Sequence, residues 1–339
     1  MGSTTTRRWV LAKRPEDIPQ PTDFALEDKP LPALAPGQVK IRVTHFSLDP
    51  GMRPALSRDT YVPATPIGGL ITSAGLAVVE ESADASLVPG DMVTGGFGWQ
   101  SAAVVKARHC VKQDPAMFAG KVTPTAAIGV LGIPGMTAWF GLKRIARLAA
   151  GETVLVSSAS GPVGATAGQI AKKLGAARVV GLAGTPEKCS WVTGVAGFDA
   201  CIDYRTADDL TAAMLHATEG GADVYFDNVG AEMLDAAIMA LKPGGRIAMS
   251  GQLAEYNRAT PHGIRNTLPF ITQRLSMAGF VVLDFARDFA AAAAQMARWI
   301  DDGALIYREE IIDGLENAPH AYADLFTGGG FGRRLVHVG

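Results

Sequence analysis

Residues 154–164 are the part of the chain that most restricts its fold. They read Val-Leu-Val-Ser-Ser-Ala-Ser-Gly-Pro-Val-Gly, an apolar run followed by a turn of small residues and the start of a helix. Gly161 and Gly164 hold the second and third positions of a GxGxxG pattern, and Ala159 holds the first. Such glycines let the backbone approach a diphosphate and let helix and strand pack closely. A tight turn without a ligand is the alternative interpretation. The dinucleotide contacts predicted here are Gly161, Pro162, Val163 and Gly164.

Short apolar runs alternate with helical segments from about residue 135 to residue 300. The runs are typical of parallel strands that are buried on both faces, and the segments between them show helical spacing. We expect strands at 153–157, 178–182, 201–204, 223–227 and 246–250, and helices at 136–150, 163–174, 232–241 and 286–300. Strands that alternate with helices predict a doubly wound parallel sheet, an α/β Rossmann fold.

Residues 1–125 have a different texture, with short apolar runs between turns rich in proline and glycine. Strand-like runs at 39–43, 77–80 and 102–105 predict a mainly β domain. The strand-like run at 334–338 would return to that domain. A chain of 339 residues, 48% of them apolar, is long enough to form two domains with separate cores.

The end of the second strand of the predicted Rossmann sheet bears on which dinucleotide binds. NAD sites usually place an Asp or Glu there for the ribose 2′-hydroxyl, but residues 181–185 contain no carboxylate. Lys188 comes shortly afterwards and could meet a 2′-phosphate as a point charge. Tyr204, after the third strand, could add a hydroxyl. A solvated helix lysine is the alternative for Lys188. The pattern favours NADP.

Charge and ligand spacing argue against several other classes of protein. Lys and Arg total 31 against 33 Asp and Glu, so a nucleic-acid partner is not expected. The histidines are dispersed, and only His109 adjoins a cysteine, so no metal site is expected. Cys110, Cys189 and Cys201 lack CxxC spacing; two of them could form a disulfide, but the spacing favours buried or idle thiols. Among the functions compatible with a dinucleotide site, hydride transfer without a metal is the one that remains.

The uncharged stretch 122–142 has the length of a membrane span. It contains Pro124, Pro134 and four glycines, which suit two short buried segments better than one spanning helix. Residues 1–8 have no apolar run of the kind found in signal peptides. We therefore expect a cytoplasmic protein without a membrane segment.

Several motifs together resemble the medium-chain dehydrogenase/reductase superfamily. The resemblance is to its zinc-independent branch of NADPH-dependent double-bond reductases, which includes leukotriene hydroxydehydrogenase/prostaglandin reductase, plant alkenal reductases and bacterial curcumin reductase. It extends from residue 47 to the C-terminus. The matching stretches are 47–53, 132–139, 161–172, 226–230, 250–252 with 256–257, 279–282 and 314–319.

The resemblance implies a domain organisation and a set of site residues. A GroES-like substrate domain would comprise 1–125 and 306–339, and a Rossmann NADP-binding domain would comprise 126–305. Lys188 and Tyr204 would hold the 2′-phosphate, and Asn228 would contact the nicotinamide ribose. Backbone groups of residues 280–282 would bind the carboxamide. The implied cofactor set also includes Thr137, Ser250, Gly251, Tyr256, Phe280, Val281 and Val282.

The implied reaction is reduction of the C=C bond of an α,β-unsaturated ketone or aldehyde, with NADPH as hydride donor. Tyr256 is the candidate catalytic residue, because negative charge builds on the carbonyl oxygen and needs a donor. A structural loop tyrosine is the alternative for Tyr256. Two other functions stay open: an NADPH quinone reductase, and a non-catalytic NADPH-binding protein.

Two positions depart from the family pattern. Gly51 stands where relatives usually have Tyr, which would reshape the substrate pocket. Gly330 stands where relatives commonly have an Asn that contacts the cofactor. Members commonly pair their Rossmann sheets edge to edge, so the resemblance also implies a homodimer, here through a strand at 275–282.

Overall fold

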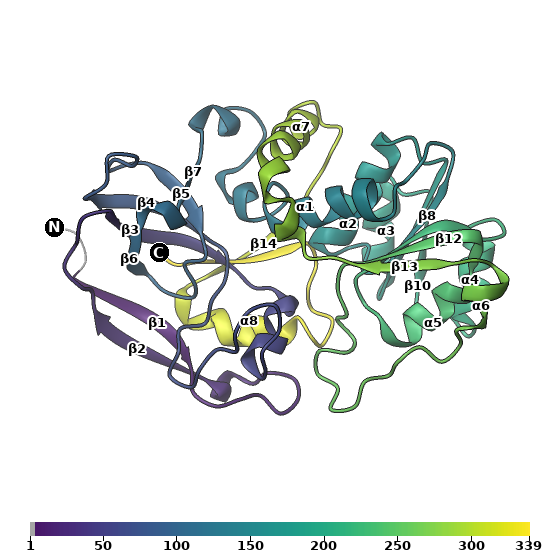
Figure 1. Ribbon diagram of the computed structural model, residues 1–339, viewed down its shortest axis with the longest axis horizontal. Coiled ribbons are helices and arrows are strands. Elements are labelled where there is room, and N and C mark those ends of the chain that lie inside the picture. Colours follow the sequence, from purple (N-terminus) through teal and green to yellow (C-terminus); the bar gives the residue numbers. More distant parts are fainter. Residues whose placement is uncertain (1–3) are drawn as a thin grey trace. The chain divides into compact units, whose positions relative to one another are not determined.

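The structure is a computed structural model that describes residues 4–339. Residues 1–3, part of the N-terminal stretch that lacks an apolar run, lie outside the described residues. The chain divides into two compact units, Met1–Gly129 with Glu309–Gly339 and Val130–Arg308. Both units are drawn in Figure 1.

The first unit is built mainly from strands. A sheet has the strand order β14-β15-β3-β4-β5-β7, with β6 paired to β3, and β1 and β2 form a separate antiparallel hairpin. Only β14 and β15 run parallel to each other. The elements are β1 (Thr5–Leu11), β2 (Phe24–Pro30), β3 (Gln38–Ser47), β4 (Gly75–Ser82), β5 (Met92–Gly95), β6 (Ala102–Lys106), β7 (Val111–Lys112), β14 (Glu309–Asp313), α8 (Ala318–Asp324) and β15 (Arg333–His337).

Aromatic side chains form the centre of this unit's core. Trp99 is fully buried, and its ring centroid lies 5.4 Å from that of Phe24 and 5.9 Å from that of Phe46. Tyr322, from α8, packs edge-on to Trp99 at 5.5 Å. Because Tyr322 comes from the C-terminal part of the chain, residues far apart in the sequence complete one core.

The second unit contains a six-stranded parallel sheet with the order β10-β9-β8-β11-β12-β13. Its centre is β8, four buried residues in a Thr-Val-Leu-Val run. The elements are α1 (Ile133–Phe140), β8 (Thr153–Val156), α2 (Pro162–Lys173), β9 (Arg178–Ala183), α3 (Pro186–Gly194), β10 (Ala200–Asp203), α4 (Leu210–Ala217), β11 (Ala222–Asp227), α5 (Ala231–Met239), β12 (Leu241–Met249), α6 (Leu268–Thr272), β13 (Ser276–Gly279) and α7 (Phe289–Asp301). The predicted α/β Rossmann sheet with a mainly β domain is confirmed.

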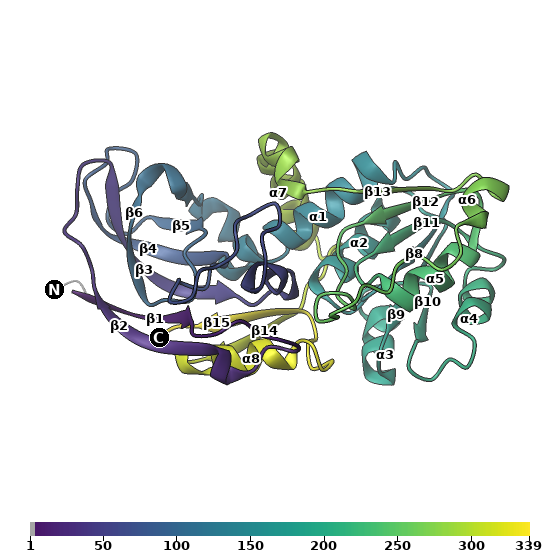
Figure 2. The same ribbon diagram turned by 60° about the horizontal axis from the view of Figure 1, so that its bottom comes forward.

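Helices cover both faces of the parallel sheet, as Figures 1 and 2 show. Met214 of α4 and Leu234 of α5 pack in one core with Leu155 of β8. On the other face, a side chain at Gly181 of β9 would meet Val192 of α3 at 3.0 Å. Burial on both faces explains why these strands are continuous apolar runs.

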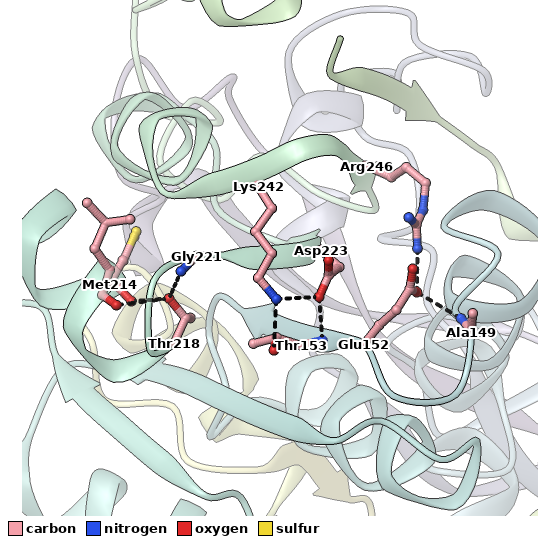
Figure 3. Close-up of polar contacts among 10 residues, drawn as sticks. Ala149, Glu152, Thr153, Met214, Thr218, Gly221, Asp223, Lys242 and Arg246 are labelled. Carbon is pink, nitrogen blue, oxygen red and sulfur yellow. Dashed lines mark hydrogen bonds and ion pairs between the residues drawn. The ribbon is translucent and has the colours of Figure 1, made fainter. Parts of the chain in front are cut away.

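Polar groups hold together the amino ends of the central strands (Figure 3). The carboxylate of Asp223 accepts a hydrogen bond from the backbone N–H of Thr153 at 2.8 Å and pairs with Lys242 at 2.9 Å. Arg246 pairs with Glu152, which also accepts from the backbone N–H of Ala149. With this edge occupied by structural contacts, ligands are expected at the opposite, carboxyl edge.

Two predicted elements differ from the structure. The strand expected at 275–282 extends only over Ser276–Gly279, and a 3-10 helix begins at Val282. The helix expected over 136–150 is α-helical only to Phe140, widens into a π-helical segment at Gly141–Ile145 and then ends. A side chain at Gly141 would lie 2.5 Å from the ring of Phe226, so the chain passes very close to β11 there. This close packing and the wider turn replace the regular helix that the apolar spacing suggested.

The expectation of idle thiols was wrong for two of the three cysteines. Cys189 and Cys201 form a disulfide with a Cα–Cα distance of 5.2 Å. Cys110 is a free thiol, and burial raises its pKa to about 11.

Within residues 4–339, no helix is long and apolar enough to cross a membrane.

Candidate cofactor and active site

The turn after β8 has the close backbone packing that the glycine pattern predicted. A Cβ at Gly164 would lie 2.3 Å from the carbonyl oxygen of Ser158, and one at Gly161 would lie 2.9 Å from the Ser158 hydroxyl. Ala159 at the first glycine position is accommodated from the neighbouring strand, because a Cβ at Gly181 would come within 2.6 Å of the Ala159 methyl. The absence of a side chain at Gly181 therefore leaves room for the Ala159 methyl group, which a glycine at position 159 would not need.

The N-terminus of α2 opens from this turn. Gly161 is its N-cap residue and supplies no side-chain cap, and Pro162 has no N–H. The N–H groups of Val163 and Gly164, in the first turn, have no partner four residues back in a helix. Together with the positive end of the helix dipole, they form a favourable position for the phosphates of a dinucleotide.

Asn228 ties together the carboxyl ends of three strands. Its side-chain N–H donates to the carbonyl of Ser157 at 2.7 Å, and its side-chain oxygen accepts from the Ser250 hydroxyl at 2.6 Å. Its backbone N–H donates to the Ser157 hydroxyl at 2.8 Å. The structure thus brings together two predicted site residues, Asn228 and Ser250, and fixes the orientation of the Asn228 amide.

Asp227 organises the same loop, and the sequence reasoning missed it. One of its carboxylate oxygens accepts from the Tyr225 hydroxyl at 2.9 Å and from the backbone N–H groups of Val229 and Gly230, each at 3.0 Å. Within residues 4–339 its other carboxylate oxygen has no hydrogen-bond partner. Burial raises the pKa of Asp227, despite these donors. The signal available in the sequence was an Asp at the end of an apolar run, followed three residues later by Gly230. In the structure Gly230 has a φ of 74°.

Tyr256 lies beside the Asn228 loop. Its hydroxyl oxygen accepts a hydrogen bond from the backbone N–H of Gln252 at 3.2 Å. A Cβ at Gly251 would lie 3.4 Å from that hydroxyl and 3.2 Å from the carbonyl oxygen of Asn228. In the bond from Gln252 the phenol oxygen is the acceptor, so this bond does not use the hydroxyl hydrogen. The backbone N–H of Gln252 therefore fixes the position of the hydroxyl group.

The segment that follows Tyr256 is anchored to α5. Arg258 donates to both carboxylate oxygens of Glu232, at 2.9 and 2.8 Å. The side chain of His262 is only 2% exposed and lies 2.7 Å from Asp235. His262 is therefore a buried anchor of this loop on α5.

The end of β9 carries no carboxylate and is covered by a phenol and a guanidinium. A Cβ at Gly184 would lie 2.8 Å from the Tyr204 hydroxyl and 3.1 Å from Nε of Arg205. Lys188 stands in the first turn of α3, where its backbone N–H donates to the Thr185 hydroxyl at 3.2 Å. Arg205 was not among the predicted residues, although it directly follows Tyr204. These groups suit a 2′-phosphate.

The other predicted cofactor residues are inside the same unit. Thr137 lies in α1, and its hydroxyl donates to the carbonyl of Ile133 at 2.8 Å. Phe280 follows β13, and a Cβ at Gly141 would lie 3.0 Å from its ring. The carbonyl of Val281 accepts from the N–H of Asp284 at 3.1 Å, and Val282 is buried.

The two positions that depart from the family pattern belong to the first unit. A Cβ at Gly51 would meet nothing within 4 Å, and one at Gly330 would lie 3.0 Å from Leu325. The turn that contains Gly51 is fixed by Asp49, which pairs with buried Arg333. Arg333 also donates to the carbonyl of Ile128 at 3.0 Å.

No group of three or more His, Cys, Asp or Glu side chains in the described part of the chain is placed to hold a metal ion.

Known proteins share the sequence and the fold of this chain over nearly its whole length. Two family models match, one described as the N-terminal domain of oxidoreductase over residues 7–113 and one as zinc-binding dehydrogenase over residues 162–298. The chain is 38% identical to the NADPH-dependent curcumin reductase of Escherichia coli (strain K12), over 98% of this chain and 96% of that protein. It is 35% identical to the 2-alkenal reductase (NADP(+)-dependent) of Nicotiana tabacum, over 98% of each. The crystal structure of CurA in complex with NADPH from Vibrio vulnificus is similar, with a TM-score of 0.90, 33% identity, and coverage of 98% of this chain and 99% of that one.

Proposed function

Since this chain belongs to the medium-chain dehydrogenase/reductase family, in the branch of the curcumin and alkenal reductases, we propose that it reduces the C=C bond of α,β-unsaturated ketones or aldehydes with NADPH. The observation that supports this best is the carboxyl edge of the parallel sheet. There a glycine turn shaped for a diphosphate and the ordered Asn228–Tyr256 group belong to one unit.

The residues fit NADPH in three places. The Gly161–Gly164 turn would receive the diphosphate at the N-terminus of α2, because the absence of a Cβ at Gly164 lets the helix start pack closely on the Ser157–Ser158 backbone. Lys188 and Tyr204 would hold the 2′-phosphate, with Arg205 beside them. Asn228, whose amide is oriented by Ser157 and Ser250, would donate to the nicotinamide ribose. When bound, NADPH supplies the hydride, which the β carbon of the substrate accepts.

Tyr256 would stabilise the charge that the reaction develops. Addition of hydride to the β carbon breaks the C=C π bond, whose electron pair forms a new π bond between the α carbon and the carbonyl carbon. The C=O π pair moves onto oxygen, which gives an enolate. The Tyr256 hydroxyl, oriented by the N–H of Gln252, would donate to that oxygen. A proton from solvent then adds to the α carbon and restores the carbonyl, so the products are a saturated ketone or aldehyde and NADP⁺.

The assay that tests this function is NADPH oxidation with a panel of small enones, repeated with NADH, with quinones and after EDTA treatment. We expect NADPH-specific turnover that gives the saturated carbonyl compound and is insensitive to EDTA. Faster turnover of quinones would favour a quinone reductase. NADPH binding with no turnover on either class would favour a non-catalytic binding protein.

The assembly and location are further parts of the proposal. β13 lies at the edge of the six-stranded sheet, and Ser276, Ala278 and Gly279 on it are exposed. An exposed edge strand can pair with a second copy of itself, which supports the predicted homodimer through 275–282. The cytoplasmic location, the absence of a nucleic-acid partner and the division into substrate and NADP-binding domains stay predictions.

A further inference from the structure

The disulfide lies between the two segments that carry the proposed 2′-phosphate ligands. Cys189 follows Lys188 directly in the first half of α3. Cys201 is the second residue of β10, which ends at Asp203, immediately before Tyr204. The S–S bond therefore links the helix that presents Lys188 to the strand that presents Tyr204.

α3 is a short helix that packs on β9 and β10. It has nine residues, and helices of that length are marginal without tertiary packing. Its noncovalent anchors include the Thr185 cap at its start, the buried Val192 against the face of Gly181, and the bond from the Phe198 N–H to the Val192 carbonyl at 3.1 Å. After α3, the chain reaches β10 through residues 195–199, three of which are exposed. The covalent link closes this segment over a sequence separation of 12.

We propose that the Cys189–Cys201 disulfide positions Lys188 and Tyr204 for the 2′-phosphate and makes the choice between NADPH and NADH depend on the thiol redox state. The disulfide form holds both ligands in register and binds NADPH strongly. In the dithiol form α3 keeps its packing on the sheet but loses the covalent link to β10, so Lys188 and Tyr204 are held less precisely for the 2′-phosphate. NADH lacks that phosphate, so its affinity does not change. This inference rests on the proposed cofactor site.

The redox step is thiol–disulfide exchange with a low-molecular-weight disulfide such as oxidised glutathione. The thiolate of one cysteine attacks the small disulfide, and the second cysteine then displaces the remaining small thiol. One S–S bond forms and one breaks; the two protein thiols lose two protons and two electrons, and two small thiols are released. Cys189 and Cys201 are both half-buried, so a small reagent reaches them. Disulfides in cytoplasmic proteins usually cycle between the two redox states in this way.

The experiment compares full-length protein treated with oxidised glutathione and with dithiothreitol, with the state of the bond checked by mass. Dissociation constants are measured for NADPH, NADH, 2′,5′-ADP and 5′-ADP, without substrate. We expect the disulfide form to bind NADPH and 2′,5′-ADP at least about fivefold more tightly than the dithiol form, the lower end of typical coupling between linked sites. The affinities for NADH and 5′-ADP should change less than twofold.

Three variants make the assignment specific. Cys189→Ser with Cys201→Ser should bind NADPH like the dithiol form and should not respond to dithiothreitol. Cys110→Ser is the matched control and should keep the full response, since Cys110 lies in the first unit. Lys188→Ala should lose most of the response, because the positioned charge is gone.

Some results would overturn the inference. One is an equal change in the affinities for NADPH and NADH between the redox states, which a purely structural disulfide would give. The others are identical NADPH affinities in the two redox states and failure of the disulfide to form with oxidised glutathione. Absence of NADPH binding in both states would instead contradict the proposed cofactor. Lack of enone turnover would leave these binding constants unaffected, so the two proposals fail separately.

Discussion

Gly164→Ala is expected to abolish tight NADPH binding while the protein stays folded. The new Cβ would lie 2.3 Å from the carbonyl oxygen of Ser158 and 2.9 Å from that of Ser157. Both are backbone atoms that cannot rotate away, so the start of α2 must move from the turn. Loss of two phosphate hydrogen bonds, at about 1.5–3 kcal/mol each, corresponds to at least about a hundredfold weaker binding. Titration of NADPH by fluorescence or calorimetry measures it.

Two other glycines serve as comparisons for this variant. Gly194→Ala, near the end of α3, adds a methyl where nothing lies within 4 Å and should leave NADPH affinity unchanged. Gly161→Ala meets mainly the Ser158 hydroxyl at 2.9 Å, a side-chain atom that can rotate, so its loss should be smaller than that of Gly164→Ala. Overpacking of this kind costs about 1–3 kcal/mol of stability, which thermal unfolding would report separately. Unchanged NADPH affinity in Gly164→Ala would remove this turn from the cofactor site.

Tyr256→Phe is expected to lower kcat on a good enone by about a hundredfold to a thousandfold. Loss of one oriented donor to a developing oxyanion costs about 2.7–4 kcal/mol in the barrier. The phenylalanine ring keeps the shape of the side chain and loses only the hydroxyl, which accepts the Gln252 N–H. Single-turnover measurements with saturating NADPH isolate the chemical step from product release.

The controls for Tyr256→Phe separate chemistry from binding and folding. The Kd for NADPH should stay within a few-fold of the unaltered protein, because the diphosphate and 2′-phosphate contacts are unchanged. Tyr307→Phe, which removes a phenol elsewhere in the same unit, should leave turnover unchanged. If Tyr256→Phe turns over enone at the original rate, another group must stabilise the enolate.

Local sequence patterns were sufficient to predict the parallel sheet and its turn. The β8 run, the following glycines and Pro162 specify strand, turn and helix within about 20 residues, so neighbours in sequence are also neighbours in space. The same holds for the position of Tyr204 after β10. The Asn228, Ser250 and Tyr256 set came from the family resemblance, and the structure brings these side chains together at one loop.

Features that depend on distant contacts were not predictable in this way. The space for Ala159 comes from Gly181, on a neighbouring strand. The change from α-helix to π-helix after Phe140 accompanies the close approach of Gly141 to Phe226. The partner of Cys189 lies in another element, and CxxC spacing says nothing about such a pair. The roles of Asp227 and His262 likewise appear only when the loops they anchor are placed in space.

The position of isotope in the product tests the central claim most directly. NADPH that carries deuterium at the transferable C4 position is turned over with a simple enone in ordinary water, and the product is analysed by NMR and mass spectrometry. The proposed reaction predicts a saturated ketone with one deuterium at the β carbon and ordinary hydrogen at the α carbon. Deuterium on the carbinol carbon of an allylic alcohol would show carbonyl reduction instead and would contradict the assignment.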